Sequence, residues 1–231
     1  MRLTILELPA RWNAVGLALA DVDSALTART DTDLVLLPEA SLTGYLSPED
    51  DADLTPFAEP LDGPTSRACA ALASKHRVHL VAPLVLREGA GLYNAMVCHA
   101  PDGTQPFVYR KRHPWIPETW ATPGAEPLPV VTIDDRTVTI AICYDLHFLP
   151  RESADQLEAA DVLLFPSAWV EQPDFRIPRL QRLAHNFSIT IANANWGAGD
   201  VVVPGQGGSC VVGVDGRVVE RVAANRIDLS V

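Results

Sequence analysis

The sequence has no long apolar run and few basic side chains, and each shortage argues against a class of protein. None of its hydrophobic stretches approaches the roughly 18 residues of a membrane-spanning helix, so we expect no membrane insertion. The 231 residues include 18 Lys and Arg against 29 Asp and Glu, which leaves a formal net charge of -11. Because binding to nucleic acid or to anionic lipid requires a basic face, we expect neither as a partner.

Cysteine is also scarce, and its spacing argues against a metal site or a disulfide framework. The four cysteines contain no C-x-x-C pair and have no histidine cluster of zinc-finger spacing beside them, so we expect no metal ion. The apolar run at the N-terminus is too short for a secretion signal, because Glu7 and Pro9 interrupt it. We therefore expect a cytoplasmic protein with reduced thiols. The cysteines are Cys69, Cys98, Cys143 and Cys210.

The apolar residues, which make up 48% of the chain with Ala, Tyr and Cys counted among them, follow strand and helix patterns in turn. Continuous apolar runs at 33–37 and 161–165 are typical of strands that are buried on both faces. We expect helices over 14–29, 64–76, 151–160 and 174–187, and further strands over 3–8, 78–86, 92–100, 105–109, 137–142, 189–194, 210–214 and 218–222. The two halves repeat one order of elements, which predicts an α/β fold with sheets inside and helices outside, in a single domain of residues 1–231.

Three of the predicted strands lead directly into a residue that could take part in chemistry. The strand at 33–37 leads to Glu39, the one at 105–109 to Lys111 and the one at 137–142 to Cys143. Because α/β folds place their sites at the carboxyl ends of strands, we expect these side chains at one sheet edge. A thiol, an ammonium and a carboxylate there would supply a nucleophile, an oxyanion stabiliser and a general base for attack on a carbonyl-like carbon.

Each of these residues has a plainer interpretation when it is taken alone. A lone cysteine is most often a buried structural thiol, a glutamate at a strand end is often solvated, and a lysine between two arginines is often a surface charge. Lys111 stands out because it and Lys75 are the only lysines in a chain that otherwise uses arginine. A role that requires a compact ammonium explains this exception.

Several segments together resemble the nitrilase superfamily of carbon-nitrogen hydrolases, over nearly the whole chain. DLVLLPEASLTGY, YRKRHPW and TIAICYDLHF are similar to the segments that carry the family's catalytic glutamate, lysine and cysteine, which implies those roles for Glu39, Lys111 and Cys143. GLYNAMVCHAPDG, ETWATPG and GGSCVVGVDGRVV occur in the order that the family has them. The resemblance implies a four-layer αββα sandwich, no cofactor, and assembly into a homodimer or a larger homo-oligomer.

The resemblance also implies a mechanism and two supporting residues. Glu39 would take the proton of Cys143 as the sulfur attacks an amide carbon, and Lys111 with the backbone N–H of Tyr144 would hold the oxyanion. A thioester would remain, and Glu39 would activate the water that hydrolyses it. Glu118 matches a second acid of the family, which orients the lysine or contacts the substrate; a solvated loop acid is the alternative.

The residues after the cysteine favour an amide or carbamoyl bond over a nitrile, because nitrilases tend to carry Trp-Glu where this chain has Tyr144-Asp145. We expect a cysteine-dependent hydrolase of a small amide or carbamoyl compound that releases ammonia or an amine. The alternatives are a nitrilase or an amine-acceptor acyltransferase of the same fold, and a non-catalytic domain that binds a ligand or partner. His147 stands where many amidases have an arginine close to a substrate carboxylate. The candidate substrate-binding residues are Tyr45, Trp115, His147 and Trp169.

Overall fold

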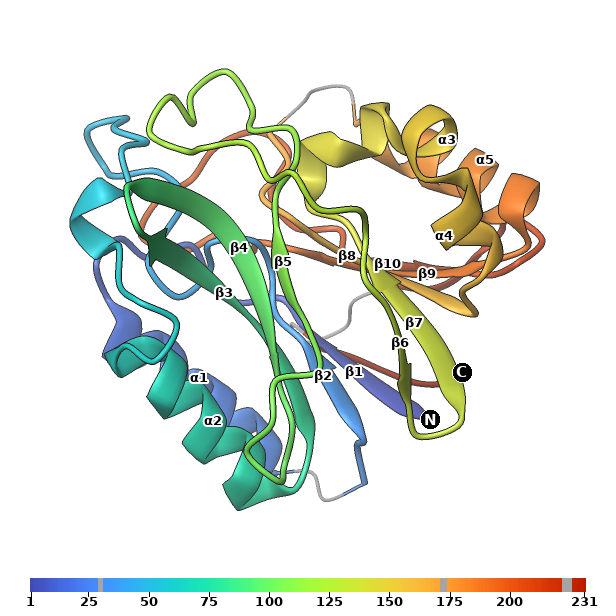
Figure 1. Cartoon of the computed structure of the whole chain (residues 1–231), viewed down its shortest axis with the longest axis horizontal. Coiled ribbons are helices and arrows are strands. Elements are labelled where there is room, and N and C mark those ends of the chain that lie inside the picture. The colour runs from blue at the N-terminus through green and yellow to red at the C-terminus, as the bar shows by residue number, and fades with distance from the viewer. Residues whose placement is uncertain (29–30, 171–173, 222–225) are drawn as a thin grey trace.

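The computed structural model describes residues 1–28, 31–170, 174–221 and 226–231, in which two facing sheets lie between layers of helices (Figure 1). The first sheet has the order β12-β1-β2-β3-β4-β5, and the second has the order β11-β10-β9-β8-β7-β6. The predicted αββα sandwich is therefore confirmed. The strands of the first sheet are β1 (Arg2–Leu6), β2 (Leu34–Leu36), β3 (His79–Glu88), β4 (Gly91–His99), β5 (Val108–Arg110) and β12 (Arg226–Ser230). Those of the second are β6 (Val130–Ile133), β7 (Arg136–Ile140), β8 (Val162–Ser167), β9 (Thr190–Asn195), β10 (Cys210–Val212) and β11 (Val218–Arg221).

The two sheets share one strand pattern, as the repeated order of elements in the sequence predicts. In the first sheet β1, β2 and β3 run parallel, with antiparallel β12 on one side and the antiparallel pair β4 and β5 on the other. In the second sheet β7, β8 and β9 run parallel, between antiparallel β6 and the antiparallel pair β10 and β11. Strands β2, β5 and β7 each lead into one of the three residues that the sequence marks for chemistry.

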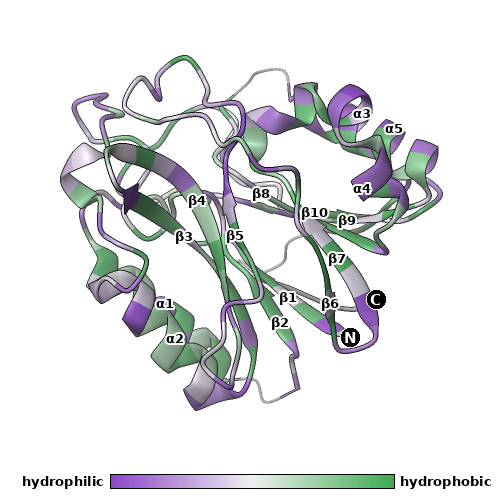
Figure 2. Ribbon diagram, in the orientation of Figure 1, coloured by the Kyte–Doolittle hydropathy of each residue, from purple (hydrophilic) through white to green (hydrophobic). Residues whose placement is uncertain are grey.

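Helices cover the outer face of each sheet (Figure 1). The first sheet is covered by α1 (Val15–Thr27) and α2 (Pro64–His76), and the second by α3 (Leu149–Glu152), α4 (Ala154–Glu158) and α5 (Arg176–Phe187). Strand β2 is apolar at every position because both of its faces are buried. Leu34 and Leu36 face the core between the sheets, whereas Val35 packs with Val22 and Leu26 beneath the helices. Figure 2 shows the same division, with hydrophobic strands inside and hydrophilic residues along the helices.

The structure differs from the predicted elements at several boundaries. Strand β12 was not predicted; it pairs antiparallel with β1 and brings the C-terminal residues beside the N-terminal strand. The helix predicted at 151–160 is two short helices that are interrupted at Ser153, and α5 begins at Arg176 rather than at 174. Pro178 is tolerated in its first turn, because backbone N–H groups there have no helical partner. Strand β5 begins at Val108 rather than at 105, and Val222 lies outside the described residues.

Candidate active site

The three candidate catalytic residues come from both sheets. Glu39 follows β2 and Lys111 follows β5 in the first sheet, whereas Cys143 opens a 3-10 turn, η2 (Cys143–His147), after β7 of the second. Strands β3 and β4 separate β2 from β5. The expectation of a single sheet edge is thus corrected: the sandwich joins strand ends of two facing sheets, and the site lies where they meet.

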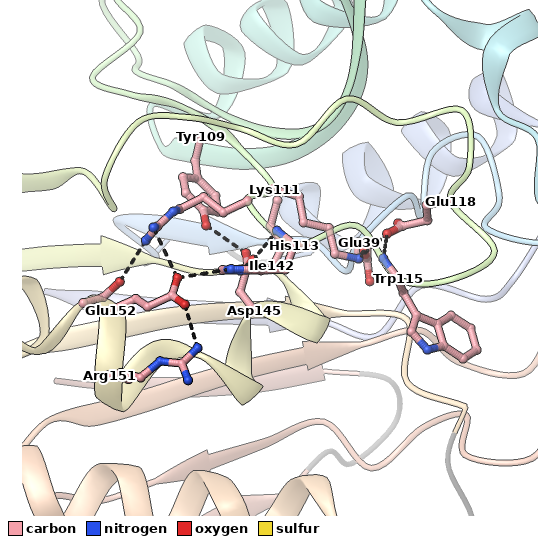
Figure 3. Close-up of polar contacts among 12 residues, drawn as sticks. Glu39, Tyr109, Lys111, His113, Trp115, Glu118, Ile142, Asp145, Arg151 and Glu152 are labelled. Carbon is pink, nitrogen blue, oxygen red and sulfur yellow. Dashed lines mark hydrogen bonds and ion pairs between the residues drawn. The ribbon is translucent and has the colours of Figure 1, made fainter.

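The Lys111 ammonium lies between two carboxylates in the interior (Figure 3). Its Nζ is 2.6 Å from Oε1 of Glu39 and 2.8 Å from Oε2 of Glu118. All three side chains are buried, which excludes the solvated interpretation of both acids and the surface-charge interpretation of the lysine. Two buried carboxylates that hydrogen-bond one ammonium hold it in a defined position and favour its protonated form.

Asn94 on β4 completes this cluster, and the sequence interpretation did not identify it. Its Nδ2 donates to Oε1 of Glu39 at 2.8 Å and to Oε1 of Glu118 at 2.5 Å, and its backbone oxygen accepts from the N–H of Lys111 at 2.8 Å. The available signal was a polar side chain within the apolar segment that ends β4. Burying a side-chain amide without hydrogen-bond partners destabilises the fold, and the two carboxylates supply these partners to Asn94.

The pKa values of the cluster follow from burial and from its excess of negative charge. Burial lowers the pKa of Lys111, but the charges of Glu39 and Glu118 outweigh it and raise that pKa well above its ordinary value. Burial raises the pKa of Glu118, and Lys111 offsets part of this rise. Lys111 therefore stays an ammonium through neutral and alkaline pH and suits the stabilisation of negative charge rather than proton abstraction.

Cys143 lies against the same cluster with a strained backbone. Its φ of 45° falls in the left-handed region, which side chains other than glycine adopt at a cost. The N–H of Ala168 donates to Oε2 of Glu39 at 2.8 Å, and it lies near enough to the Cys143 sulfur to lower the pKa of that thiol slightly. The sulfur and the carboxylate are thus neighbours around one backbone N–H group.

The surroundings of the Cys143 thiol favour its protonated form. Burial and then the negative charge of Glu39 raise the pKa of Cys143 well above its ordinary value, against a smaller opposing effect of Lys111. A thiol in this state requires a base to become a nucleophile, and Glu39 lies beside it. The other thiols, Cys69, Cys98 and Cys210, are buried in α2, β4 and β10, as the structural interpretation predicts for them.

Asp145 connects the lysine segment to the cysteine turn, across the two sheets. Its Oδ2 accepts from the Tyr109 hydroxyl at 2.8 Å and from the Ile142 N–H at 3.0 Å. Its Oδ1 accepts from the His113 N–H at 2.9 Å and lies 3.0 Å from Nδ1 of the same residue (Figure 3). Tyr109 and His113 stand on either side of Lys111 in the chain, so this one carboxylate holds both segments in register.

A cavity of about 400 Å³ opens beside the cysteine. Of the residues predicted to bind substrate, Trp115, His147 and Trp169 line it, together with Tyr144. Tyr45 instead packs edge-on against Trp196, with ring centroids 5.9 Å apart, and lies close enough to the cluster that burial and Glu118 raise the pKa of its hydroxyl. The lining residues are Trp115, Cys143, Tyr144, His147, Ala168, Trp169 and Val170.

The described part of the chain has neither a metal-binding cluster nor a membrane-spanning helix. No group of three or more His, Cys, Asp or Glu side chains there is placed to hold a metal ion. No helix in residues 1–28, 31–170, 174–221 and 226–231 has the length and apolar character to cross a membrane. Lys111 supplies the positive charge of the buried cluster.

Comparison with known families decides the relationship that these residues suggest. The family described as Carbon-nitrogen hydrolase matches residues 6–231. The chain belongs to the carbon-nitrogen hydrolase family. The resemblance to the nitrilase superfamily, on which the sequence interpretation depends, is thereby confirmed.

Individual relatives are distant in sequence. An (R)-stereoselective amidase of a Pseudomonas species is 27% identical over 95% of this chain and 80% of its own length. A protein of Pseudomonas protegens named as a hydrolase in the pqqF 5' region is 28% identical over 76% of this chain. The chain spans 62% of the length of that relative.

Solved structures resemble this chain over almost its whole length. A CN-hydrolase superfamily protein from Xanthomonas campestris has a TM-score of 0.84 at 22% identity, covering 99% of this chain and 89% of its own. An amidase from Nesterenkonia sp. has a TM-score of 0.83 at 24% identity, covering 99% and 90%. At these identities the likeness establishes the shared fold.

Proposed function

We propose that this carbon-nitrogen hydrolase is a cysteine-dependent amidase that hydrolyses a small non-peptide amide through a thioester intermediate. Glu39 is the general base, Lys111 the oxyanion stabiliser and Cys143 the nucleophile. One observation carries the proposal: the Glu39 carboxylate binds Lys111 with one oxygen and accepts from the Ala168 N–H with the other, and both Glu39 and Lys111 lie close enough to Cys143 to shift the pKa of its thiol. That arrangement joins base, nucleophile and cation in a buried site.

The first half of the reaction forms the acyl-enzyme. Glu39 takes the proton of Cys143 as the sulfur attacks the amide carbon, and the carbonyl electrons move to the oxygen. Lys111 and the backbone N–H of Tyr144 stabilise this oxyanion. When the oxyanion collapses, the carbon-nitrogen bond breaks and Glu39 returns its proton to the nitrogen, which leaves as ammonia or an amine. The product bound to the enzyme is a thioester.

The second half regenerates the enzyme. Glu39 accepts a proton from water as the water oxygen attacks the thioester carbon. Collapse of the second oxyanion breaks the carbon-sulfur bond, and the sulfur takes the proton back from Glu39. Glu118 keeps Lys111 charged and oriented during both steps, because it binds the ammonium as a second carboxylate in addition to Glu39.

Names of the relatives support an amide substrate. Besides the (R)-stereoselective amidase, they include a formamidase of Allorhizobium ampelinum and a citrullinase of Francisella tularensis, each 25% to 27% identical. A probable nitrilase of Schizosaccharomyces pombe is 25% identical. Nitrile hydrolysis and acyl transfer to an amine are the alternatives within this fold. Turnover of nitriles identifies the first, and mass spectrometry of the released product, a free acid or a transferred amide, identifies the second.

The test combines ammonia release with intact-mass detection of the acyl adduct. The parent is incubated with simple amides, carbamoyl compounds and nitriles, alongside Cys143→Ala and the matched control Cys69→Ala, which removes a buried thiol from α2. We expect the parent and the control to release ammonia and to carry one acyl group, and Cys143→Ala to do neither. An active Cys143→Ala variant would overturn the mechanism. Equal reaction of all four thiols with iodoacetamide, without turnover, would favour a non-catalytic binding domain.

A further inference from the structure

The cavity beside Cys143 is walled mainly by aromatic and aliphatic side chains. Trp115, Tyr144, Trp169 and Val170 form most of its lining, with His147 among them. The rings of His147 and Trp169 lie 16° from parallel with centroids 6.0 Å apart, and the Tyr144 ring lies 4.8 Å from that of His147. Aromatic faces of this kind stabilise a bound ring by stacking and by burial of apolar area.

Its size exceeds what the smallest amides require. A volume of about 400 Å³ lies within the range of roughly 300–1,000 Å³ that holds drug-sized ligands. Formamide or acetamide would leave most of these walls in contact with water. An acyl group that carries a ring or a chain of several carbons would cover them.

The charged cluster next to Cys143, which lines the cavity, opposes an anionic substrate. The buried cluster holds two carboxylates, Glu39 and Glu118, and the one ammonium of Lys111, which both of them bind. No Lys or Arg occurs among the described residues that line this cavity. A carboxylate on the acyl part would therefore lose its hydration beside net negative charge and without a cation to pair with.

The neighbouring arginines belong to a different hollow. Arg179 and Arg182 on α5 line a second cavity of about 240 Å³; among the described residues, the two cavities share only His147. A carboxylate would have to extend past His147 to reach them. The aromatic walls next to the sulfur are encountered first by any acyl group bonded there.

We propose that the cavity selects amides whose acyl part is uncharged and apolar, with an aromatic ring the best occupant, and discriminates against amides that carry a carboxylate. This inference rests on the proposed function. Trp115 shows how the chain separates the charged cluster from the apolar cavity. Its backbone N–H donates to Oε2 of Glu118 at 2.5 Å, while its indole ring extends away from the carboxylates (Figure 3). The polar cluster thus faces the scissile bond, and the ring faces the acyl group.

The test measures kcat/KM of the parent for propanamide, 3-phenylpropanamide, hexanamide and glutaramate. We expect 3-phenylpropanamide to exceed propanamide by about tenfold or more, because its ring is buried. Hexanamide, which is similar in length to glutaramate, should exceed it by about a hundredfold or more, because only glutaramate carries an unpaired charge. If no amide is hydrolysed, the proposed function fails. If glutaramate is hydrolysed as well as hexanamide, this inference alone fails.

A variant pair locates the discrimination. His147→Arg places a guanidinium on the cavity wall, and we expect it to raise kcat/KM for glutaramate by about tenfold or more relative to hexanamide. His185→Arg adds the same charge at an exposed position of α5 and should leave the ratio unchanged. A ratio that does not move in His147→Arg contradicts the inference. A parent preference for glutaramate that disappears in Arg179→Gln would place the anion in the second cavity and overturn it.

Discussion

Replacing Asp145 by asparagine should loosen the connection between the two strand ends that carry Lys111 and Cys143. Asp145 is 1% exposed, and its carboxylate accepts four hydrogen bonds, two on each oxygen. Asparagine keeps one acceptor oxygen and turns an NH₂ group toward the other two donors. Two hydrogen bonds to a carboxylate, each worth about 1.5–3 kcal/mol, are then lost, so we expect a loss of about 3–6 kcal/mol in the free energy of unfolding.

The assay is urea denaturation, with the slope of the transition checked against that of the parent. The same variant should lose about a hundredfold in kcat, because a displacement of about 1 Å between nucleophile and oxyanion donor has that effect. Asp50→Asn is the matched control, since it removes the same charge from an exposed turn whose φ of 63° asparagine tolerates. We expect it to change stability by less than about 0.5 kcal/mol.

A double-mutant cycle with Tyr109 sharpens this prediction. Tyr109→Phe removes one of the four donors and should cost about 1–2 kcal/mol in the parent, but much less when Asp145→Ala, which removes both acceptor oxygens, is already present. The reasoning is refuted if Asp145→Asn loses less than about 1 kcal/mol and keeps its kcat, or if Tyr109→Phe and Asp145→Ala are additive.

Three other perturbations test separate parts of the structure. Lys111→Met leaves two buried carboxylates without their cation and should lower the unfolding free energy by about 3–5 kcal/mol, and this deficit should narrow in acid as a carboxylate takes up a proton; urea melts at pH 5 and pH 8 measure it. Burial lowers the pKa of His99 to about 4, so protons bind mainly to the unfolded chain below its ordinary pKa. As pH falls from about 6.5 toward 4, the parent should therefore lose up to about 3 kcal/mol relative to His99→Leu, and parallel pH profiles of the two proteins would contradict this. Gly44 and Gly103 share a φ of 87°, but a Cβ at Gly44 would lie 2.4 Å from the Arg11 backbone oxygen whereas Gly103 has open space. Gly44→Ala should cost about 2–4 kcal/mol and Gly103→Ala only about 1 kcal/mol in the same denaturation assay, and equal losses would refute the contact.

The sequence predicted the layers and the central strands because hydrophobic patterning is local. The run around β2 is apolar at every position and proves to be buried on both faces. Strand β12 escaped prediction because its partner, β1, stands at the opposite end of the chain, and its short segment has no turn signal linking it to a neighbour. Pairing between distant segments is a property of the assembled sheet.

The candidate site could be predicted as residue types but not as an arrangement. Glu39, Lys111 and Cys143 follow the ends of strands that the hydrophobic pattern of the sequence predicts. Asn94 and Asp145 could not be assigned, because each acts through partners on other strands or on the facing sheet. The φ of 45° at Cys143 could not be predicted either, because the usual sequence signal for a positive φ is a glycine and this position holds a cysteine.

The left-handed backbone at Cys143 lowers the stability of the fold at the position of the proposed nucleophile. Such a conformation costs about 1–3 kcal/mol for most residues, and glycine adopts it with little penalty. A library of variants at residue 143 selected for heat resistance alone should therefore enrich glycine and asparagine, and every survivor of that kind should be inert. If cysteine is nevertheless retained at residue 143 in a population, selection for turnover must outweigh the gain in stability that glycine or asparagine would give.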